Sequence, residues 1–165
     1  MVRRQLTLFV DIIAAKSIED IRKKFNPLQF ALIPAHVTLC REGECENMEK
    51  IKANILHLRP KKITMQFGQP ARINGGAGVI MKSKCGEEDF HLLRNMILYG
   101  ITKNISHLEP HITLVHARNG VCTDTIWEQI QNYNLPTTFQ FNTISHIEQV
   151  DGGDWKVLES FELYY

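Results

Sequence analysis

The sequence contains one short phrase twice, His36-Val37-Thr38-Leu39 and, 75 positions later, His111-Ile112-Thr113-Leu114. In each copy polar and apolar residues alternate with period two, which predicts a β-strand with its His and Thr on one face and its aliphatic residues in a core. We therefore expect two strands that present two imidazoles and two hydroxyls to one cleft.

Other features recur at nearly the same offset, which indicates a diverged internal duplication. Pro60 and Pro136 are 76 positions apart, and each introduces a β-like run that contains Gln-Phe, at 66–67 and at 140–141. A helical pattern of apolar residues also follows each motif. We predict one domain over residues 1–165, formed by repeats at about 1–75 and 76–165 that build two lobes.

The order of predicted elements is the same in both repeats. The first is expected to contain strand 5–12, helix 17–30 with Ser17 and Asp20 as its capping signal, motif strand 35–41, helix 47–58 and strand 62–73. The second is expected to contain strand 77–84, helix 87–101, motif strand 110–117, helix 124–133, strand 137–150, a turn at 151–154 and a last strand at 155–163. This pattern predicts an α+β fold whose sheets carry helices on one face and open to a cleft on the other.

Composition agrees with a single core and restricts the substrate. The chain has 165 residues, of which 44% are hydrophobic, and a formal net charge of +1. No run approaches the roughly 20 apolar residues of a membrane span, and the apolar run Leu6–Val10 is ended at once by Asp11, so no signal peptide is expected. We expect a cytoplasmic protein. A near-neutral charge argues against an extended nucleic-acid surface and favours a small or terminal phosphate.

Paired histidines suit phosphodiester chemistry, because an imidazole with an ordinary pKa of about 6.5 can accept or donate a proton near neutrality. One ring would activate water and the other would protonate the departing oxygen. Thr38 and Thr113 would donate hydrogen bonds to phosphate oxygens. Arg41 and Arg118 follow the two motifs and are further candidates for the cleft, although an exposed arginine at a strand end is the alternative interpretation.

Four cysteines, at positions 40, 45, 85 and 122, show no spacing typical of a zinc site and are expected to be free thiols. Cys40 should share the cleft face of the motif strand with His36 and Thr38, as part of the cleft wall. The alternative is a metal site made by His36, Cys40 and Cys45, but the second motif has Val115 where the first has Cys40. We predict no metal and no cofactor.

Two other groups of residues could be taken for functional ones. His116 follows His111 by five residues and is expected on the opposite side of the strand, in a structural role. Trp127 and Tyr133 could stack on a base, but burial against a sheet is the simpler expectation.

With both motifs in view, the sequence resembles the two-histidine (2H) phosphoesterase superfamily, which includes bacterial RNA 2′,3′-cyclic phosphodiesterases also described as 2′-5′ RNA ligases. The resemblance rests on the two His-x-Thr-Leu motifs, the opening strand 6–10, Pro110 before the second motif, and the closing hairpin that ends in Phe161-Glu162-Leu163. It implies a bilobal fold with pseudo-twofold symmetry, in which two mainly antiparallel sheets line a central cleft and helices lie outside. It also implies catalytic His36 and His111, phosphate-binding Thr38 and Thr113, and no metal.

The resulting hypothesis is a metal-independent phosphodiesterase that acts on a 2′,3′-cyclic phosphate or a 2′-5′ linkage in a nucleotide or short RNA end. In reverse, the same pair of histidines would join RNA ends. The sequence does not assign which histidine is the base. The alternative hypothesis is a non-catalytic module that binds a nucleotide or an RNA end with the same fold, which has no need of two matched proton-transfer groups.

Overall fold

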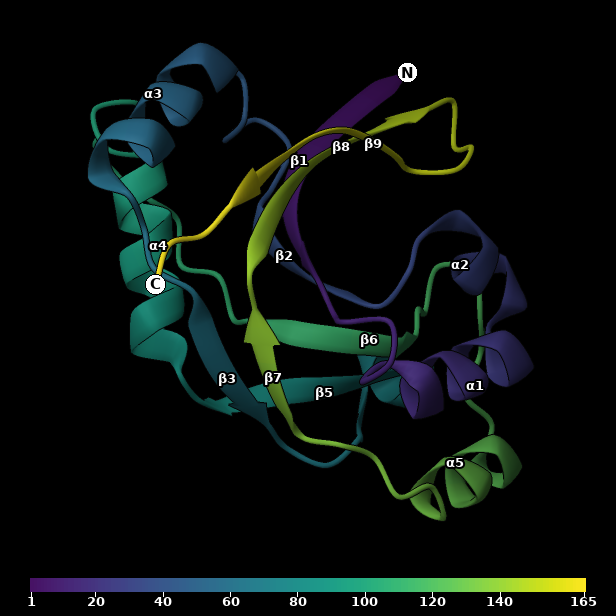
Figure 1. The fold of residues 1–165 in the computed structure, drawn as a ribbon. Helices are drawn as coiled ribbons and strands as arrows, with labels where there is room; N and C mark the ends of the chain where they lie inside the picture. Colours follow the sequence, from purple (N-terminus) through teal and green to yellow (C-terminus); the bar gives the residue numbers. More distant parts are fainter.

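The computed structural model describes residues 1–165 and contains the strands and helices that the repeat predicts (Figure 1). The first repeat holds β1 (Val2–Phe9), α1 (Lys16–Phe25), α2 (Pro27–Leu32), β2 (His36–Cys40), α3 (Met48–Leu58), β3 (Ile63–Phe67) and β4 (Ala71–Ile73). The second holds β5 (Gly78–Cys85), α4 (Glu87–Ile97), β6 (His111–Val115), α5 (Asp124–Gln131), β7 (Thr138–Phe141), β8 (Thr143–Val150) and β9 (Lys156–Glu162). A single turn of 3₁₀ helix at Asn74–Gly76 joins the repeats. None of the helices is long and apolar enough to cross a membrane.

The strands form two antiparallel sheets, as predicted for this α+β fold. The first sheet has the order β2-β1-β8-β9. In the second, β5 pairs along one edge with β4 and β3, β3 pairs with β7, and β6 pairs with the opposite edge of β5. The motif strands β2 and β6 are thus the edge strands of their sheets, and they contact each other where the two sheets meet.

The two sheets do not correspond one to one with the predicted repeats, because each repeat sends its last two strands, β3 and β4 or β8 and β9, into the other sheet. β3 belongs to the first repeat but pairs with β5, and β8 belongs to the second repeat but pairs with β1. Each exchange covers the edge of β5 or β1 that the motif strand leaves open, so neither long strand keeps an unpaired edge. The chain crosses between the sheets at Asn142, which separates β7 from β8.

Helices lie at both ends of this arrangement, with α3 and α4 on one side and α1, α2 and α5 on the other (Figure 1). The first helix of each repeat contacts the motif strand of the other repeat: α1 packs on β6, and α4 packs on β2. Their buried faces include Ile18 and Ile21 of α1 and Phe90, Leu93 and Ile97 of α4, all in one hydrophobic core. The core therefore runs continuously through both lobes.

Four details of the expected secondary structure were wrong. The strand expected over 137–150 is two strands, β7 and β8, which belong to different sheets and are separated at Asn142. The helix expected over 17–30 is two helices, because Pro27 lacks a backbone N–H and begins α2 as its first residue. The expected cap at Ser17 is absent: α1 begins at Lys16, and Asp11 instead accepts hydrogen bonds from the backbone N–H groups of Ile13 and Ala14 in the preceding turn. The strand expected over 62–73 is interrupted at residues 68–70, which include Gly68 and Pro70.

Candidate active site

The two motif strands bring their polar residues to one pocket. His36 and Thr38 on β2, and His111 and Thr113 on β6, line the same cavity of about 390 Å³. Both strands have the same burial pattern, with half-buried His and Thr alternating with fully buried aliphatic residues. The period-two pattern therefore acts as expected, and one cleft receives two imidazoles and two hydroxyls.

Each imidazole is oriented by the backbone two residues before it. His36 Nδ1 lies 2.8 Å from the carbonyl oxygen of Pro34, and His111 Nδ1 lies 2.9 Å from that of Glu109. A carbonyl oxygen only accepts hydrogen bonds, so Nδ1 carries the proton in both rings. Nε2 of each ring makes no hydrogen bond within the protein, which leaves two Nε2 atoms for a substrate.

The two threonine hydroxyls are also unoccupied. Neither Thr38 nor Thr113 makes a side-chain hydrogen bond, whereas the neighbouring Thr7, which is fully buried, donates to the carbonyl oxygen of Val37 at 3.1 Å. A hydroxyl that faces a pocket with no protein partner is free to donate to a ligand oxygen. Thr38 and Thr113 thus supply two donors beside the two imidazoles.

The electrostatic surroundings keep His36 neutral. Burial lowers the pKa of His36 to about 4, and the positive charge of Arg22, like that of His111 or His116 when protonated, acts in the same direction. The hydrogen bond to Pro34 opposes this shift without cancelling it. At neutral pH the ring of His36 is therefore an acceptor at Nε2.

Each motif ends in a β-bulge. The bulge in β2 shows that the expectation for Cys40 was wrong. Thr38 lies opposite Thr7 and Cys40 lies opposite Leu6, so Leu39 is the extra residue in β2. One extra residue reverses the alternation, and Cys40 turns away from the cleft into the core, where it is fully buried. An equivalent bulge follows Thr113, where Val115 lies opposite Val79.

The two arginines after the motifs differ in position. Arg118 lines the pocket, and its side chain has no carboxylate partner. Arg41 is exposed outside the pocket, and its backbone N–H donates to Glu44 in a tight turn. Arg41 is therefore not a cleft residue, contrary to the expectation from sequence. Arg118 lies in the pocket, within reach of a bound phosphate.

His116 also corrects an expectation, because it lines the same pocket as His111. The strand ends at Val115, and the turn that follows carries His116 back to the cleft. Its backbone N–H donates to the side chain of buried Asn26 at 2.7 Å. Burial lowers the pKa of His116, and nearby Arg118 lowers it further. The alternation rule fails here because it holds only while the chain remains a strand.

Sequence reasoning missed the remaining walls of the pocket. They come from β1, α2 and the β8–β9 hairpin, and include Arg3, Gln5, Gln29, Gln149 and Trp155. Gln5 and Gln149 are buried polar residues, exposed by only 8% and 4%. Arg3, Gln5 and Thr7 alternate with apolar or outward-facing residues along β1, and this alternation was the one local signal of a polar face. The position of Trp155 has no local signal, because it depends on the pairing of β1 with β8.

Two buried arginines, each 1% exposed, fix the backbone around the motifs. Arg22 of α1 donates at 2.7 Å to the carbonyl oxygen of Ile33 and pairs with Glu19, which accepts a hydrogen bond from the backbone N–H of Ala35 just before His36. Such charged hydrogen bonds hold the approach to the motif in one conformation.

Arg94 on α4 has the equivalent role in the second repeat. It donates to the carbonyl oxygens of Leu39 and of Ser106, the latter at 2.9 Å, and pairs with Glu44 at 2.8 Å. Arg94 thereby ties the end of the first motif to the segment that leads into the second.

The alternative metal site is not assembled. No group of three or more His, Cys, Asp or Glu side chains lies close enough together to hold a metal ion. Cys40 and Cys45 are buried, and the Cys45 thiol donates to the carbonyl oxygen of Arg41 at 3.5 Å. A larger hollow of about 820 Å³, between the start of β1, the turn after β2 and β9, contains neither motif. Its basic residues Arg3, Arg4 and Lys52 are paired with Glu42, Glu148 and Glu159.

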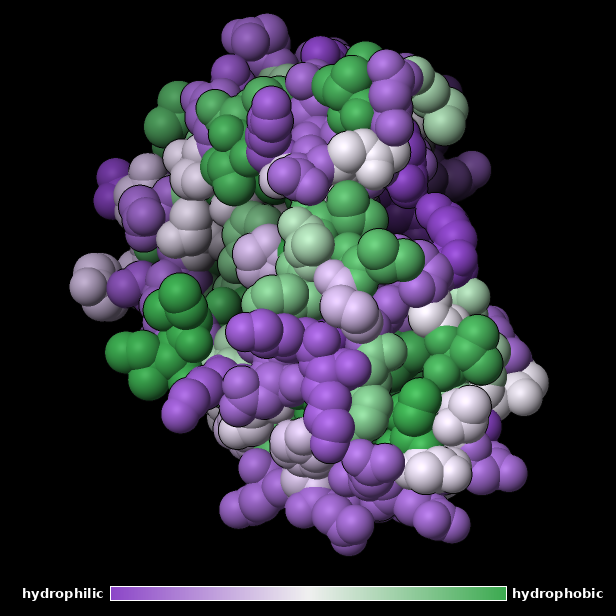
Figure 2. Space-filling view, turned by 90° about the vertical axis from the view of Figure 1, so that its right-hand side faces the viewer, coloured by the Kyte–Doolittle hydropathy of each residue, from purple (hydrophilic) through white to green (hydrophobic).

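On the face that carries α1, α2 and α5, groups of hydrophobic side chains lie among hydrophilic ones (Figure 2). The polar pocket between the motifs is the feature whose residues have a defined chemistry.

Comparisons with known proteins agree with this fold. Comparison with curated protein sequences finds no significant match. Among solved structures, the Escherichia coli LigT in apo form has a TM-score of 0.66 at 15% identity, and LigT complexed with 3′-AMP has 0.66 at 16%, each over 99% of this chain and 98% of LigT. TT0787 of Thermus thermophilus has a TM-score of 0.62 at 16% identity, over 98% of this chain and 97% of its own. The model of the 2′-5′ RNA ligase superfamily matches residues 10–153, and the chain therefore belongs to that superfamily.

Proposed function

We propose that this protein is a metal-independent phosphodiesterase that hydrolyses a 2′,3′-cyclic phosphate or a 2′-5′ linkage in a nucleotide or short RNA end. The observation that carries the proposal is the matched pair His36 and His111, each with Nδ1 held by a backbone carbonyl and Nε2 unoccupied in the same pocket. Two groups placed in this way can act as base and acid on opposite sides of one phosphorus.

The lowered pKa of His36 supports its assignment as the base. His36 Nε2 takes a proton from water while the water oxygen bonds to phosphorus, and the bond from phosphorus to one ribose oxygen breaks. That oxygen receives a proton from Nε2 of protonated His111. The products are a phosphate monoester and a free ribose hydroxyl, and one water molecule is consumed.

Thr38 and Thr113 donate hydrogen bonds to the phosphate oxygens on which negative charge increases at the transition state. Arg118 supplies the positive charge of a pocket in which Arg3 is already paired with Glu42. With a net charge of only +1 and a cavity of about 390 Å³, a single nucleotide or an RNA terminus fits better than a long polymer. In reverse, the same residues would join a cyclic phosphate end to a 5′-hydroxyl.

The test is hydrolysis of nucleoside 2′,3′-cyclic phosphates and of short RNAs with cyclic-phosphate ends or 2′-5′ linkages, in the presence of a chelator. Wild type is compared with His36→Ala and His111→Ala, and each variant should lose roughly 10²- to 10⁴-fold in rate. His57→Ala, on the distant helix α3, is the matched control. Turnover that ignores both motif substitutions would contradict the proposal, and saturable binding without turnover would identify a binding module.

A further inference from the structure

The two tryptophans have different surroundings. Trp127 on α5 packs against the hydrophobic core. Trp155 lies outside that core, in the turn between β8 and β9, and its half-buried ring lines the pocket that holds both motifs. Because Trp155 adds little to the core and forms a wall of the pocket, its position points to a role in binding a ligand.

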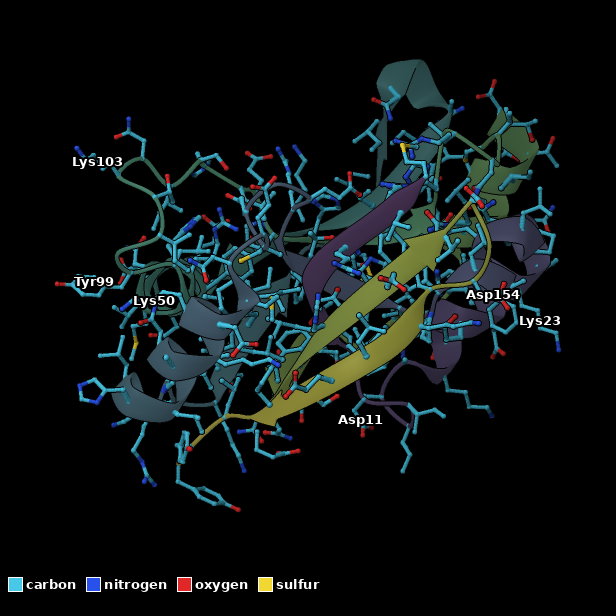
Figure 3. The ribbon with its side chains drawn as sticks, turned by 90° about the horizontal axis from the view of Figure 1, so that it is seen from above. Asp11, Lys23, Lys50, Tyr99, Lys103 and Asp154 are labelled. Carbon is cyan, nitrogen blue, oxygen red and sulfur yellow. The ribbon has the colours of Figure 1, made fainter.

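The backbone of Trp155 is held in place from two sides. Its N–H donates at 2.9 Å to the carbonyl oxygen of Leu32 at the end of α2. The amide of Gln149, which is 4% exposed, donates at 2.8 Å to the carbonyl oxygen of Gly153 in the same turn. Figure 3 labels the adjacent Asp154, which lies on the side of Lys23 and α1, away from Lys50 and Tyr99. The turn is therefore fixed over the α2 side of the pocket.

The ring itself is held by a cation. The guanidinium carbon of Arg3 lies 5.3 Å from the centre of the Trp155 ring, within the range of a cation–π contact. Arg3 is in turn held by Glu42, at 2.5 Å, and by the side-chain oxygen of Gln149, at 3.0 Å. An aromatic ring fixed before a ligand arrives loses little conformational entropy on binding.

We propose that the nucleobase of the substrate stacks on the face of the Trp155 ring opposite Arg3, so that this site takes cyclic phosphates of nucleosides in preference to those without a base. The proposal rests on the proposed function of the same pocket. The lining of the pocket agrees with this arrangement. Arg118 and His116, which follow the second motif, form a polar wall, whereas Trp155 forms an aromatic wall beside the β8–β9 hairpin.

A binding measurement tests the platform without any turnover. The chain has two tryptophans, so in Trp127→Phe the fluorescence of Trp155 is observed alone. Adenosine 3′-phosphate should quench this fluorescence with a saturable curve, because a base stacks on the ring, and ribose 5-phosphate should not. Quenching absent with the nucleotide, or equal with both ligands, would overturn the proposal.

Kinetics supply the second readout. Stacking on an aromatic side chain contributes enough that Trp155→Ala should lose about 5- to 150-fold in kcat/KM on adenosine 2′,3′-cyclic phosphate, mainly through KM. Glycerol 1,2-cyclic phosphate, which has no base, should be hydrolysed equally by wild type and Trp155→Ala. Trp155→Phe should restore most of the loss, and Trp127→Phe should match wild type.

An equal loss on both substrates in Trp155→Ala would indicate a structural role and overturn the platform. Failure of wild type to hydrolyse either substrate would overturn the proposed function instead, while the fluorescence titration would still decide whether a base stacks on Trp155.

Discussion

The pH dependence of hydrolysis depends on which histidine is the base. A base must be unprotonated to act, so the rate rises with pH through the pKa of that group and is constant above it. Burial lowers the pKa of His36 to about 4. At pH 5.5 a group with that pKa is about 97% unprotonated, whereas an ordinary histidine with a pKa of about 6.5 is about 9% unprotonated. We therefore expect kcat/KM at pH 5.5 to be close to its plateau value, whereas with an ordinary imidazole base it would be about one tenth of its plateau.

The assay is kcat/KM for a nucleoside 2′,3′-cyclic phosphate between pH 4 and 9, at constant ionic strength. The residual activity of His36→Ala should lack the acidic limb, because no base remains to titrate there. His111→Ala should keep the acidic limb, because His36 is still present to titrate there. An NMR titration of the His36 ring in the free protein gives the same pKa without relying on the rate.

Two results would refute this reasoning. An acidic limb with a midpoint near pH 6.5 in wild type would mean that burial does not depress the base. An acidic limb that persists in His36→Ala and disappears in His111→Ala would reverse the roles of the two rings.

Other consequences can be measured directly. Thr38→Val keeps the shape of the side chain but removes its hydroxyl donor, so kcat should fall by up to roughly 10²- to 10³-fold with an unchanged circular dichroism spectrum. Arg94→Met breaks a buried ion pair and should lower the free energy of unfolding in urea by about 3–5 kcal/mol, whereas Arg4→Met, in a half-exposed pair, should change it by less than about 1 kcal/mol. Of the four thiols only Cys85 is exposed, so one equivalent of a thiol reagent should react rapidly with the native protein and the other three only after unfolding; rapid reaction of two or more would contradict the buried positions.

Local pattern was sufficient for the motif residues because each of the four depends on a strand only five residues long. Within β2 and β6 the alternation is regular as far as the threonine, so His36, Thr38, His111 and Thr113 were placed together from sequence alone. The order of elements follows from the same periodicity, whereas the antiparallel sheets were implied by the resemblance to the 2H phosphoesterases.

The errors fall where one residue changes the alternation or where position depends on distant pairing. Cys40 follows a bulge residue, and His116 follows the end of a strand, so neither keeps the face that period two assigns to it. Trp155 reaches the pocket only because β8 pairs with β1 in the register that sets Arg3 opposite Gln149. The sequence around position 155 contains no local pattern that indicates its place in the pocket.

The exchange of strands between the lobes explains why the site is already formed. If each repeat formed its own sheet, the cleft between β2 and β6 would open about a hinge, since little but the linker would join the lobes. Here β3 and β8 each cross to the other sheet, and α1 and α4 each pack on the other motif strand. Opening the cleft would break the hydrogen bonds of whole strands and expose a core that spans both lobes. The spacing of the two imidazoles is therefore set by the fold before a substrate binds, which is the condition under which acid and base catalysis from two fixed groups is effective.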